Sequence, residues 1–341
     1  MNDIEVKDPE FCQIILKHRR IKNNLVILCE GTREYLNVHT PQQIKRLDDF
    51  PDANFWKQTI PMEWKSKKPV FIPCGSRSDI LRIYPQLIDL HNNDPDNSYL
   101  SLHKLFILID LDIQCQDISN ICPHYQTTEE LYHAIYENNP IDTNIIDQSK
   151  IIITGWKHKE AYFLEPDLQD YLQNELPLTK ITYKNNPLSL ETIYQDMIQD
   201  INDNPDINHR DNINNVLQRI EKFLSMSIPD KNSLINECEK LNQNSTITPQ
   251  EKRKLIEVIL KIVKAKPYWE DEITIEDDYL SENKAEDNVL LAIARFYANS
   301  CNLSDQSNST VYHIPQWVNF LYTKHKELRR FLIKEIPDDP P

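Results

Sequence analysis

The stretch NLVILCEGTREYL, residues 24–36, is an apolar run that ends in a glutamate followed by a glycine. Glycine is scarce in this chain, with three in 341 residues, so each is expected where no other residue fits. All three follow short apolar runs: LVILCEG reaches Gly31, VFIPCG reaches Gly75 and IIITG reaches Gly155. A fourth run, LFILIDLD (105–112), ends in acids instead.

These four runs are short, rich in Val and Ile, and lack a clean alternation of apolar and polar residues. This pattern is typical of strands that are covered on both faces. Helix-compatible segments such as SDILRIYPQLIDL (78–90) lie between them, and alternating strands and helices indicate a parallel sheet. The sequence therefore predicts an α/β fold with strands near 24–30, 69–73, 105–111 and 150–154.

The sequence pattern of the chain changes after about residue 180. DINDNPDINHRDN (200–212) has the composition of a connector, and TPQE (248–251) is a capping box that opens an amphipathic helix. Two more helical patterns follow, and the acidic stretch 269–287, which is read as a loop, separates the first of them from the helix that the capping box opens. We therefore expect a sheet domain over 1–180 and a mainly helical domain over 181–341.

The net charge of −15 argues against general, sequence-blind adhesion to nucleic acid. Three local basic patches remain, each either a solvated face or part of a groove: 16–24, 63–69 and 251–266. No apolar run approaches the roughly 20 residues that span a bilayer, and the N-terminus is polar and acidic. Seven cysteines without a C-x-x-C pair suit reduced thiols, so a cytoplasmic protein without a membrane partner is expected.

The acids lie where the predicted strands end. Residues two apart in a strand point the same way, so Asp110 and Asp112 present both carboxylates to one side. Burying two like charges that close is costly unless a cation neutralises them, and Mg²⁺ prefers oxygen ligands. Glu30 would supply a third carboxylate, and Gly31 would let a phosphate approach the backbone closely. The alternative is that the aspartates only cap a strand end in solvent.

The motifs LVILCEG and LFILIDLD resemble the two signature motifs of the Toprim domain, in which a first-strand Glu and a later D-x-D hold Mg²⁺. EGTRE with the downstream KHKEAYFL (157–164) is similar to the OLD-family and other Toprim-like nucleases of bacterial defence systems. The resemblance covers roughly residues 20–170, and the helical half is not part of it. It implies a Mg²⁺- or Mn²⁺-dependent nuclease that cleaves DNA or RNA, a bacterial defence or toxin-like effector.

Carried over by position, the resemblance implies that Glu30, Asp110 and Asp112 bind metal and act in catalysis. Glu160 would complete a second metal site, since two metals can clamp both oxygens of a phosphodiester. Positive charge to offset the transition state would come from Lys157, His158 or Lys159.

Two further residues have open roles. Glu34, one helical turn after Glu30, is either a further metal ligand or an acid favoured at a helix start. Arg77, at the helix start after Gly75, would contact a substrate phosphate, as Gly31 and Lys157 would; the alternative is an exposed arginine.

Other functions compete with a nuclease. A haloacid-dehalogenase-type phosphatase also has D-x-D after a strand, but there it follows the first strand, and here Gln114 stands where that family has Thr or Val. A non-catalytic module would bind nucleic acid or a protein partner and keep its acids for structure. The helical half would then recruit a partner or form a homodimer, a role that it would also have in a nuclease.

Overall fold

The computed structural model describes residues 8–33, 51–137, 140–224, 228–240, 248–301 and 312–334. Its central feature is a four-stranded parallel sheet with the strand order β2-β1-β3-β4. The strands are β1 (Val26–Cys29), β2 (Val70–Pro73), β3 (Leu105–Ile109) and β4 (Ile151–Ile153). Each lies within one of the four predicted ranges, and the 105–111 run supplies an inner strand. The predicted parallel sheet is confirmed.

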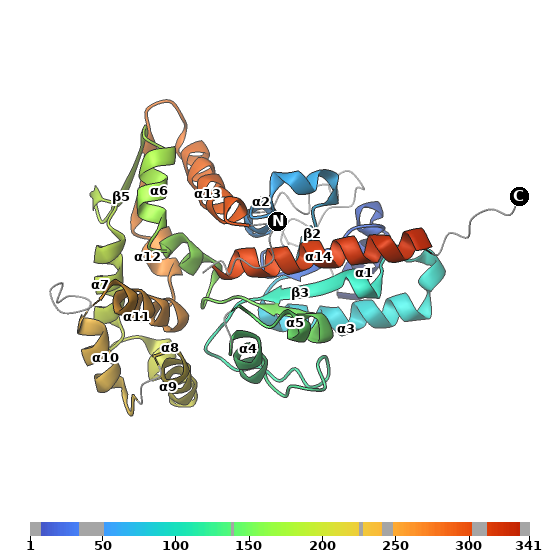
Figure 1. Ribbon diagram of the computed structural model, residues 1–341, viewed down its shortest axis with the longest axis horizontal. Helices are drawn as coiled ribbons and strands as arrows, with labels where there is room; N and C mark the ends of the chain where they lie inside the picture. The colour runs from blue at the N-terminus through green and yellow to red at the C-terminus, as the bar shows by residue number, and fades with distance from the viewer. Residues whose placement is uncertain are drawn as a thin grey trace, which may run out of the picture.

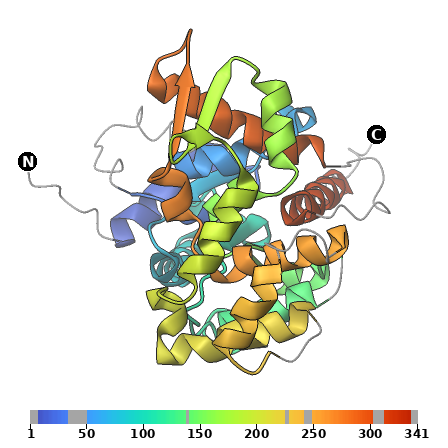
Figure 2. The same ribbon diagram turned by 90° about the vertical axis from the view of Figure 1, so that its left-hand side faces the viewer.

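Every residue of these four strands is buried, which explains why their sequences do not alternate. Helices α1 (Asp8–Leu16) and α3 (Arg77–Asn93) pack against each other on one side of the sheet. Helix α14 (His313–Lys334), the last in the chain, lies on the other side (Figures 1 and 2). Connections are completed by α2 (Pro51–Gln58), α4 (Thr128–Tyr136) and α5 (Thr143–Ser149).

Short 3₁₀ helices occupy several of the remaining connections. They are η1 (Arg19–Ile21), η4 (Met62–Lys67), η5 (Pro95–Asn97), η6 (Leu102–Lys104) and η7 (Lys159–Leu164). No helix in the described part of the chain is long and apolar enough to cross a membrane.

The second half of the chain is rich in helices, as predicted. After α6 (Leu168–Glu175), which precedes residue 181, they are α7 (Leu190–Asp200), α8 (Pro205–Asn208), α9 (Arg210–Leu224), α10 (Lys231–Glu239), α11 (Pro249–Ile262), α12 (Lys266–Glu270), α13 (Glu282–Asn299) and α14. The capping box of Thr248 and Glu251 opens α11. The expected connector 200–212 is wrong in part, because α8 and the start of α9 lie within it.

A second sheet also lies in this half. Strands β5 (Thr179–Tyr183), β6 (Asn186–Pro187) and β7 (Ile273–Asp277) form it in the antiparallel order β6-β5-β7. The acidic stretch 269–287 is therefore not a loop, since it contains β7 and the start of α13. The only apolar residues of β7 are two isoleucines that face inward, and their neighbours in the sequence are mostly acidic. Strand β5, which pairs with β7, lies about 90 residues away in the sequence.

The two halves are tied together by α14. Its Phe320 ring lies 6.0 Å from Phe106 of β3, and its Trp317 ring lies 6.0 Å from Trp56 of α2. The predicted boundary at residue 180 falls inside β5. A division of the chain into 1–180 and 181–341 thus places α14 with the second half, although it covers the first sheet.

Gly155, which follows β4, lies against the start of α14. A Cβ atom at this position would overlap the ring of His313, the first residue of α14. We expect Gly155→Ala to lower the unfolding free energy by about 1–3 kcal/mol, because overpacking displaces the neighbouring element. Urea denaturation of the single variant and of Gly155→Ala/His313→Ala is the measurement. A single variant as stable as wild type, or no relief in the double variant, would contradict this role of the glycine.

Candidate functional site

Glu30 and Asp110 meet at the carboxyl ends of the adjacent strands β1 and β3. The backbone N–H of Asp110 donates a 2.8 Å hydrogen bond to Glu30 Oε1, across 80 residues of sequence. These two predicted site residues therefore converge, as the parallel arrangement of their strands requires. Both side chains are partly buried.

Gly31 turns the chain sharply after Glu30. Its φ of +146° is a conformation that residues with a Cβ rarely adopt, and a Cβ there would lie 2.8 Å from Asp52 Oδ2. Two backbone hydrogen bonds, of 3.0 and 2.8 Å, join Gly31 to Gly75 at the end of β2. Gly31 thus fixes the position of Glu30, whereas its predicted contact with substrate stays a prediction.

The two carboxyl groups resist ionisation. Burial raises the pKa of Glu30 to about 8, and the charge of Asp110 adds to the effect, while the Asp110 N–H and Arg77 oppose it. Burial also raises the pKa of Asp110; His158 opposes this shift, and Glu160 adds to it. His158 Nδ1 lies 3.4 Å from Asp110 Oδ2. Such a pair favours a bound proton or cation, since either relieves the repulsion.

Lys159 and Glu160 begin η7, beside this pair. Lys159 Nζ forms an ion pair with Asp52 of α2 and lies 3.6 Å from Glu160 Oε1. Burial alone would lower the pKa of Lys159, but Asp52 and Glu160 raise it above its ordinary value, so the amine stays charged. Asp52 is a site residue that sequence reasoning missed, because an acid in the first turn of a helix is common everywhere.

Arg77 is buried rather than exposed and faces the acids. Its Nη2 donates to the carbonyl of Gln114 at 2.5 Å and lies 3.6 Å from Asp112 Oδ2. Its Nε is buried and has no hydrogen-bond partner among the described residues. The exposed alternative for this arginine is wrong, and its predicted contact with a substrate phosphate stays a prediction.

Asp112 is engaged away from the Glu30–Asp110 pair. Its Oδ1 accepts a 2.7 Å hydrogen bond from the Ile113 N–H, and its other oxygen faces Arg77. Among the described residues, no group of three or more His, Cys, Asp and Glu side chains is arranged to hold a metal. Of the four predicted ligands, Glu30 and Asp110 are adjacent, Asp112 would have to leave Arg77 to join them, and Glu34 lies outside the described residues.

Lys157 does not belong to the site. Its side chain is fully buried, and its Nζ donates to the carbonyl of Ile262 at 3.2 Å. Its backbone N–H also donates to the carbonyl of Leu260 at 3.0 Å, so the residue ties the turn after β4 to α11. The predicted substrate contact of Lys157 is wrong, because α11 covers this side of the turn.

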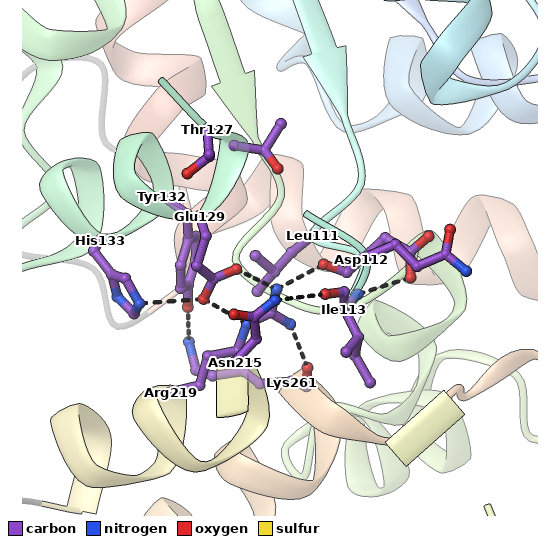
Figure 3. A network of polar contacts seen from close by, with 12 residues as sticks. Leu111, Asp112, Ile113, Thr127, Glu129, Tyr132, His133, Asn215, Arg219 and Lys261 are labelled. Atoms are coloured by element: carbon purple, nitrogen blue, oxygen red, sulfur yellow. Dashed lines mark hydrogen bonds and ion pairs between the residues drawn. The ribbon is translucent and has the colours of Figure 1, made fainter. Parts of the chain in front are cut away.

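A buried network holds the backbone that carries Asp112 (Figure 3). Arg219 of α9 donates to Glu129 Oε1 and Oε2 at 2.8 and 2.6 Å, and to the carbonyl of Asp112 at 2.6 Å. Asn215 of the same helix donates to the carbonyl of Ile113 at 3.3 Å. The acidic turn after β3 is therefore positioned by a helix of the second half, which no motif in the sequence indicated.

In this network, neighbouring charged groups shift the pKa values of Glu129 and Lys261. Burial would raise the pKa of Glu129, but hydrogen bonds from Arg219 and His133 lower it to about 2. Lys261 of α11 is also buried; its Nζ contacts Tyr132 Oη at 2.8 Å and the carbonyl of Gly155 at 3.2 Å, and burial lowers its pKa. Paired, desolvated charges of this kind fix the geometry of the elements that they join.

A cavity of about 250 Å³ opens beside Lys159 and Glu160. It lies between η7, α2, α12, α13 and β7, and Phe55, Phe163 and Trp269 form part of its wall. A partly apolar cavity therefore adjoins the carboxyl edge of the sheet, where the acidic residues lie.

The raised pKa of Glu30 predicts a pH-dependent stability in the absence of metal. Its folded pKa of about 8 exceeds the ordinary value of 4.5, so the folded protein holds a proton that the unfolded chain releases. The unfolding free energy should therefore fall as pH rises from about 4.5 to 8, by up to about 1.4 kcal/mol per pH unit. In Glu30→Gln this part of the slope should be absent. Urea titrations in EDTA at several pH values measure it, and parallel pH profiles of the two proteins would contradict it.

Comparison with protein-family models, with curated proteins and with solved structures finds no match to this chain. The likeness to Toprim nucleases therefore rests on the motifs, and the roles of the site residues are proposals.

Proposed function

We propose that the chain is a Mg²⁺- or Mn²⁺-dependent nuclease that acts at the carboxyl edge of the parallel sheet. The observation that carries the proposal is the adjacency of Glu30 and Asp110, two partly buried carboxyl groups with raised pKa values. A divalent cation between them would offset the cost of placing their two negative charges in this partly buried site. The α/β architecture is compatible with a Toprim-like domain.

Glu30 and Asp110 would hold the metal, with Asp112 joining them once it turns from Arg77. A bound divalent ion supplies a Lewis acid and an activated water for attack on a phosphodiester. Arg77, released from Asp112, would present its guanidinium to a phosphate oxygen, and its Nε lacks a partner within the described residues. Lys159 places further positive charge near Asp110, His158 Nδ1 lies 3.4 Å from Asp110 Oδ2, and Glu160 would serve a second metal.

The decisive experiment is incubation of the protein with plasmid, single-stranded DNA and total RNA, each with Mg²⁺, with Mn²⁺ or with EDTA. We expect cleavage of at least one substrate with metal and none with EDTA. Asp170→Asn, an exposed acid on α6, is the matched control and should cut like wild type. An absence of cleavage in every arm, together with no Mn²⁺ uptake by calorimetry, would overturn the proposal.

One observation favours the non-catalytic alternative. Arg77 already supplies a positive charge to Asp112 and opposes the raised pKa of Glu30, so the acids have an internal counter-ion. A binding module could keep its acids in this state permanently. Mn²⁺ calorimetry separates the alternatives, because a module of this kind takes up no metal even at millimolar concentration.

A cytoplasmic role as a defence or toxin-like effector belongs to the same proposal, as does docking of a protein partner or a second copy on the helical half. The resemblance of KHKEAYFL to defence-associated families supports the first. Light scattering of the purified protein, alone and with nucleic acid, tests the second.

A further inference from the structure

Basic side chains gather at the amino edge of the parallel sheet, opposite the acids. Parallel strands all begin at one edge, so the segments that precede them meet there. The basic residues of these segments are Lys17, Arg19, Arg20 and Lys22 before β1, Lys65, Lys67 and Lys68 before β2, Lys104 before β3 and Lys150 before β4. We call this surface the basic edge. Two of the three basic patches in the sequence, 16–24 and 63–69, thus lie at one end of the molecule.

The end of α14 adds to the basic edge. The ring of Trp64 lies 5.1 Å from Tyr322 and 6.2 Å from His325, which places this part of α14 beside η4. Lys326 Nζ lies 4.3 Å from the Tyr322 ring. In Figure 1 this end of the molecule is on the right, where α1 and the last turns of α14 lie, whereas α7 and α9 to α12 lie on the left.

The charges of the basic edge are available to a ligand. Lys17, Arg19, Lys65 and Lys67 are exposed, and within the described ranges none of them forms an ion pair with a carboxylate. Burial, and then the positive charge of Lys57, lowers the pKa of Lys68, while the carboxylate of Glu63 opposes the shift. Exposed cations that form no ion pair favour an anionic ligand.

Acids at the same end do not cancel this charge. Glu63, Asp94 and Asp96 are exposed there, and Asp147 is shared at 2.7 Å between Lys150 and Lys324. The basic residues outnumber them, in a chain with 53 acidic and 38 basic residues overall. The acids of the other edge lie one strand away, about 13 Å for four residues at ~3.3 Å each. That exceeds the screening length of about 8 Å at physiological salt, so the local charge decides what binds.

We propose that the basic edge binds the phosphate backbone of nucleic acid and tethers it to the protein independently of sequence. The exposed lysine and arginine side chains of the two segments before β1 and β2 match a ligand that repeats its negative charge along its length, whereas Lys104 is buried and Lys150 is paired with Asp147. The proposal does not depend on the proposed nuclease, because this binding requires no metal and no catalytic residue. Where both hold, the surface raises the local concentration of substrate for the acidic edge of the same or another molecule.

The test measures binding of a duplex of about 20 base pairs by fluorescence anisotropy in EDTA, in an Asp110→Asn background that cannot cut. The edge variant is Lys17→Glu/Arg19→Glu/Lys65→Glu/Lys67→Glu. The control variant, Lys264→Glu/Lys266→Glu/Lys284→Glu/Arg295→Glu, changes the net charge equally at exposed positions of the second half. Binding is followed over a series of salt concentrations with DNA and with RNA duplexes, and circular dichroism checks the fold of both variants.

We expect the edge variant to bind at least about tenfold more weakly and to have a salt slope smaller by about four, since each phosphate contact contributes about one. The control variant should lose much less. Equal losses in both variants would show that net charge alone acts, and would overturn the proposal. A parent protein that binds neither duplex would also overturn the proposal. So would an edge variant that binds the duplex normally but sediments differently when free, because that result would make the basic edge an interface between copies of the protein. Duplex binding by a wild type that neither cleaves any substrate nor takes up Mn²⁺ would remove the nuclease proposal and leave this one standing.

Discussion

Asp110→Asn is expected to lose metal-dependent cleavage by about a thousandfold or more while melting at or above the temperature of the wild type. The carboxyl of Asp110 is partly buried, which raises the cost of its charge, and Glu160 adds to that cost. Asparagine has nearly the same shape, so it removes one crowded charge without leaving a cavity. In the metal-free protein stability should therefore rise or stay level as activity disappears.

The measurement pairs a nuclease assay with melting temperatures taken with and without Mn²⁺. Wild type should gain stability from Mn²⁺, because a ligand of the folded state shifts the equilibrium, and Asp110→Asn should gain little. Glu160→Gln should fall between the two if it serves only a second metal. An aspartate that merely caps a strand behaves in the opposite way: its loss costs about 1 kcal/mol of stability and spares activity. An Asp110→Asn protein that melts lower and still cuts would remove the metal centre.

The adjacency of Glu30 and Asp110 could be predicted because it follows from a local signal and one geometric rule. Continuous apolar runs identified β1 and β3, and the carboxyl ends of parallel strands share an edge. The rule places the ends of strands, but it does not orient the side chains that follow them. Asp112, two residues beyond Asp110, therefore turns to Arg77 and the Ile113 N–H, although its spacing pointed to the same side.

Lys157 and Arg77 show a different limit. Lys157 lies in a turn and Arg77 begins α3, positions where a charged side chain is usually exposed, and both are buried. Their hydrogen-bond acceptors are the backbone carbonyls of Ile262 and Gln114. Every residue type has a backbone carbonyl, so these hydrogen bonds cannot be predicted from the types of side chain in the sequence. Gly155 is the exception, because close approach of His313 excludes every side chain there, and a scarce glycine is visible in sequence.

The fold links the two halves through the turn that carries the acids. Arg219 of α9 bonds the carbonyl of Asp112, and Lys157 in the turn after β4 bonds α11. The second half therefore does more than extend the molecule, since it fixes two turns at the carboxyl edge of the first sheet. A substitution in α9 should accordingly affect the acidic residues at this edge.

The largest stability effect is expected for Arg219→Met. This change leaves Glu129 buried beside His133 without its arginine, and breaking a buried ion pair from one side costs about 3–5 kcal/mol. The expectation has a pH signature. The folded pKa of Glu129, about 2, lies below its ordinary value of 4.5, so the stabilisation is present above about 4.5 and is lost as pH falls towards 2. The difference between wild type and variant should therefore narrow in acid.

Urea denaturation at about pH 7 and near pH 4 measures both effects, with Arg219→Met/Glu129→Gln as the matched control. The double variant should recover part of the loss, because a neutral amide is cheaper to bury than an unpaired carboxylate. A single variant that costs less than about 1 kcal/mol at both pH values would show that Glu129 is hydrated and the pair weak. If the acidic turn is catalytic, Arg219→Met should also cut more slowly under conditions where it is fully folded, because the Asp112 carbonyl loses its 2.6 Å donor. Reduced cleavage with unchanged Mn²⁺ affinity would place the effect on Arg77 and the substrate, whereas a weaker Mn²⁺ affinity would place it on the carboxylates themselves.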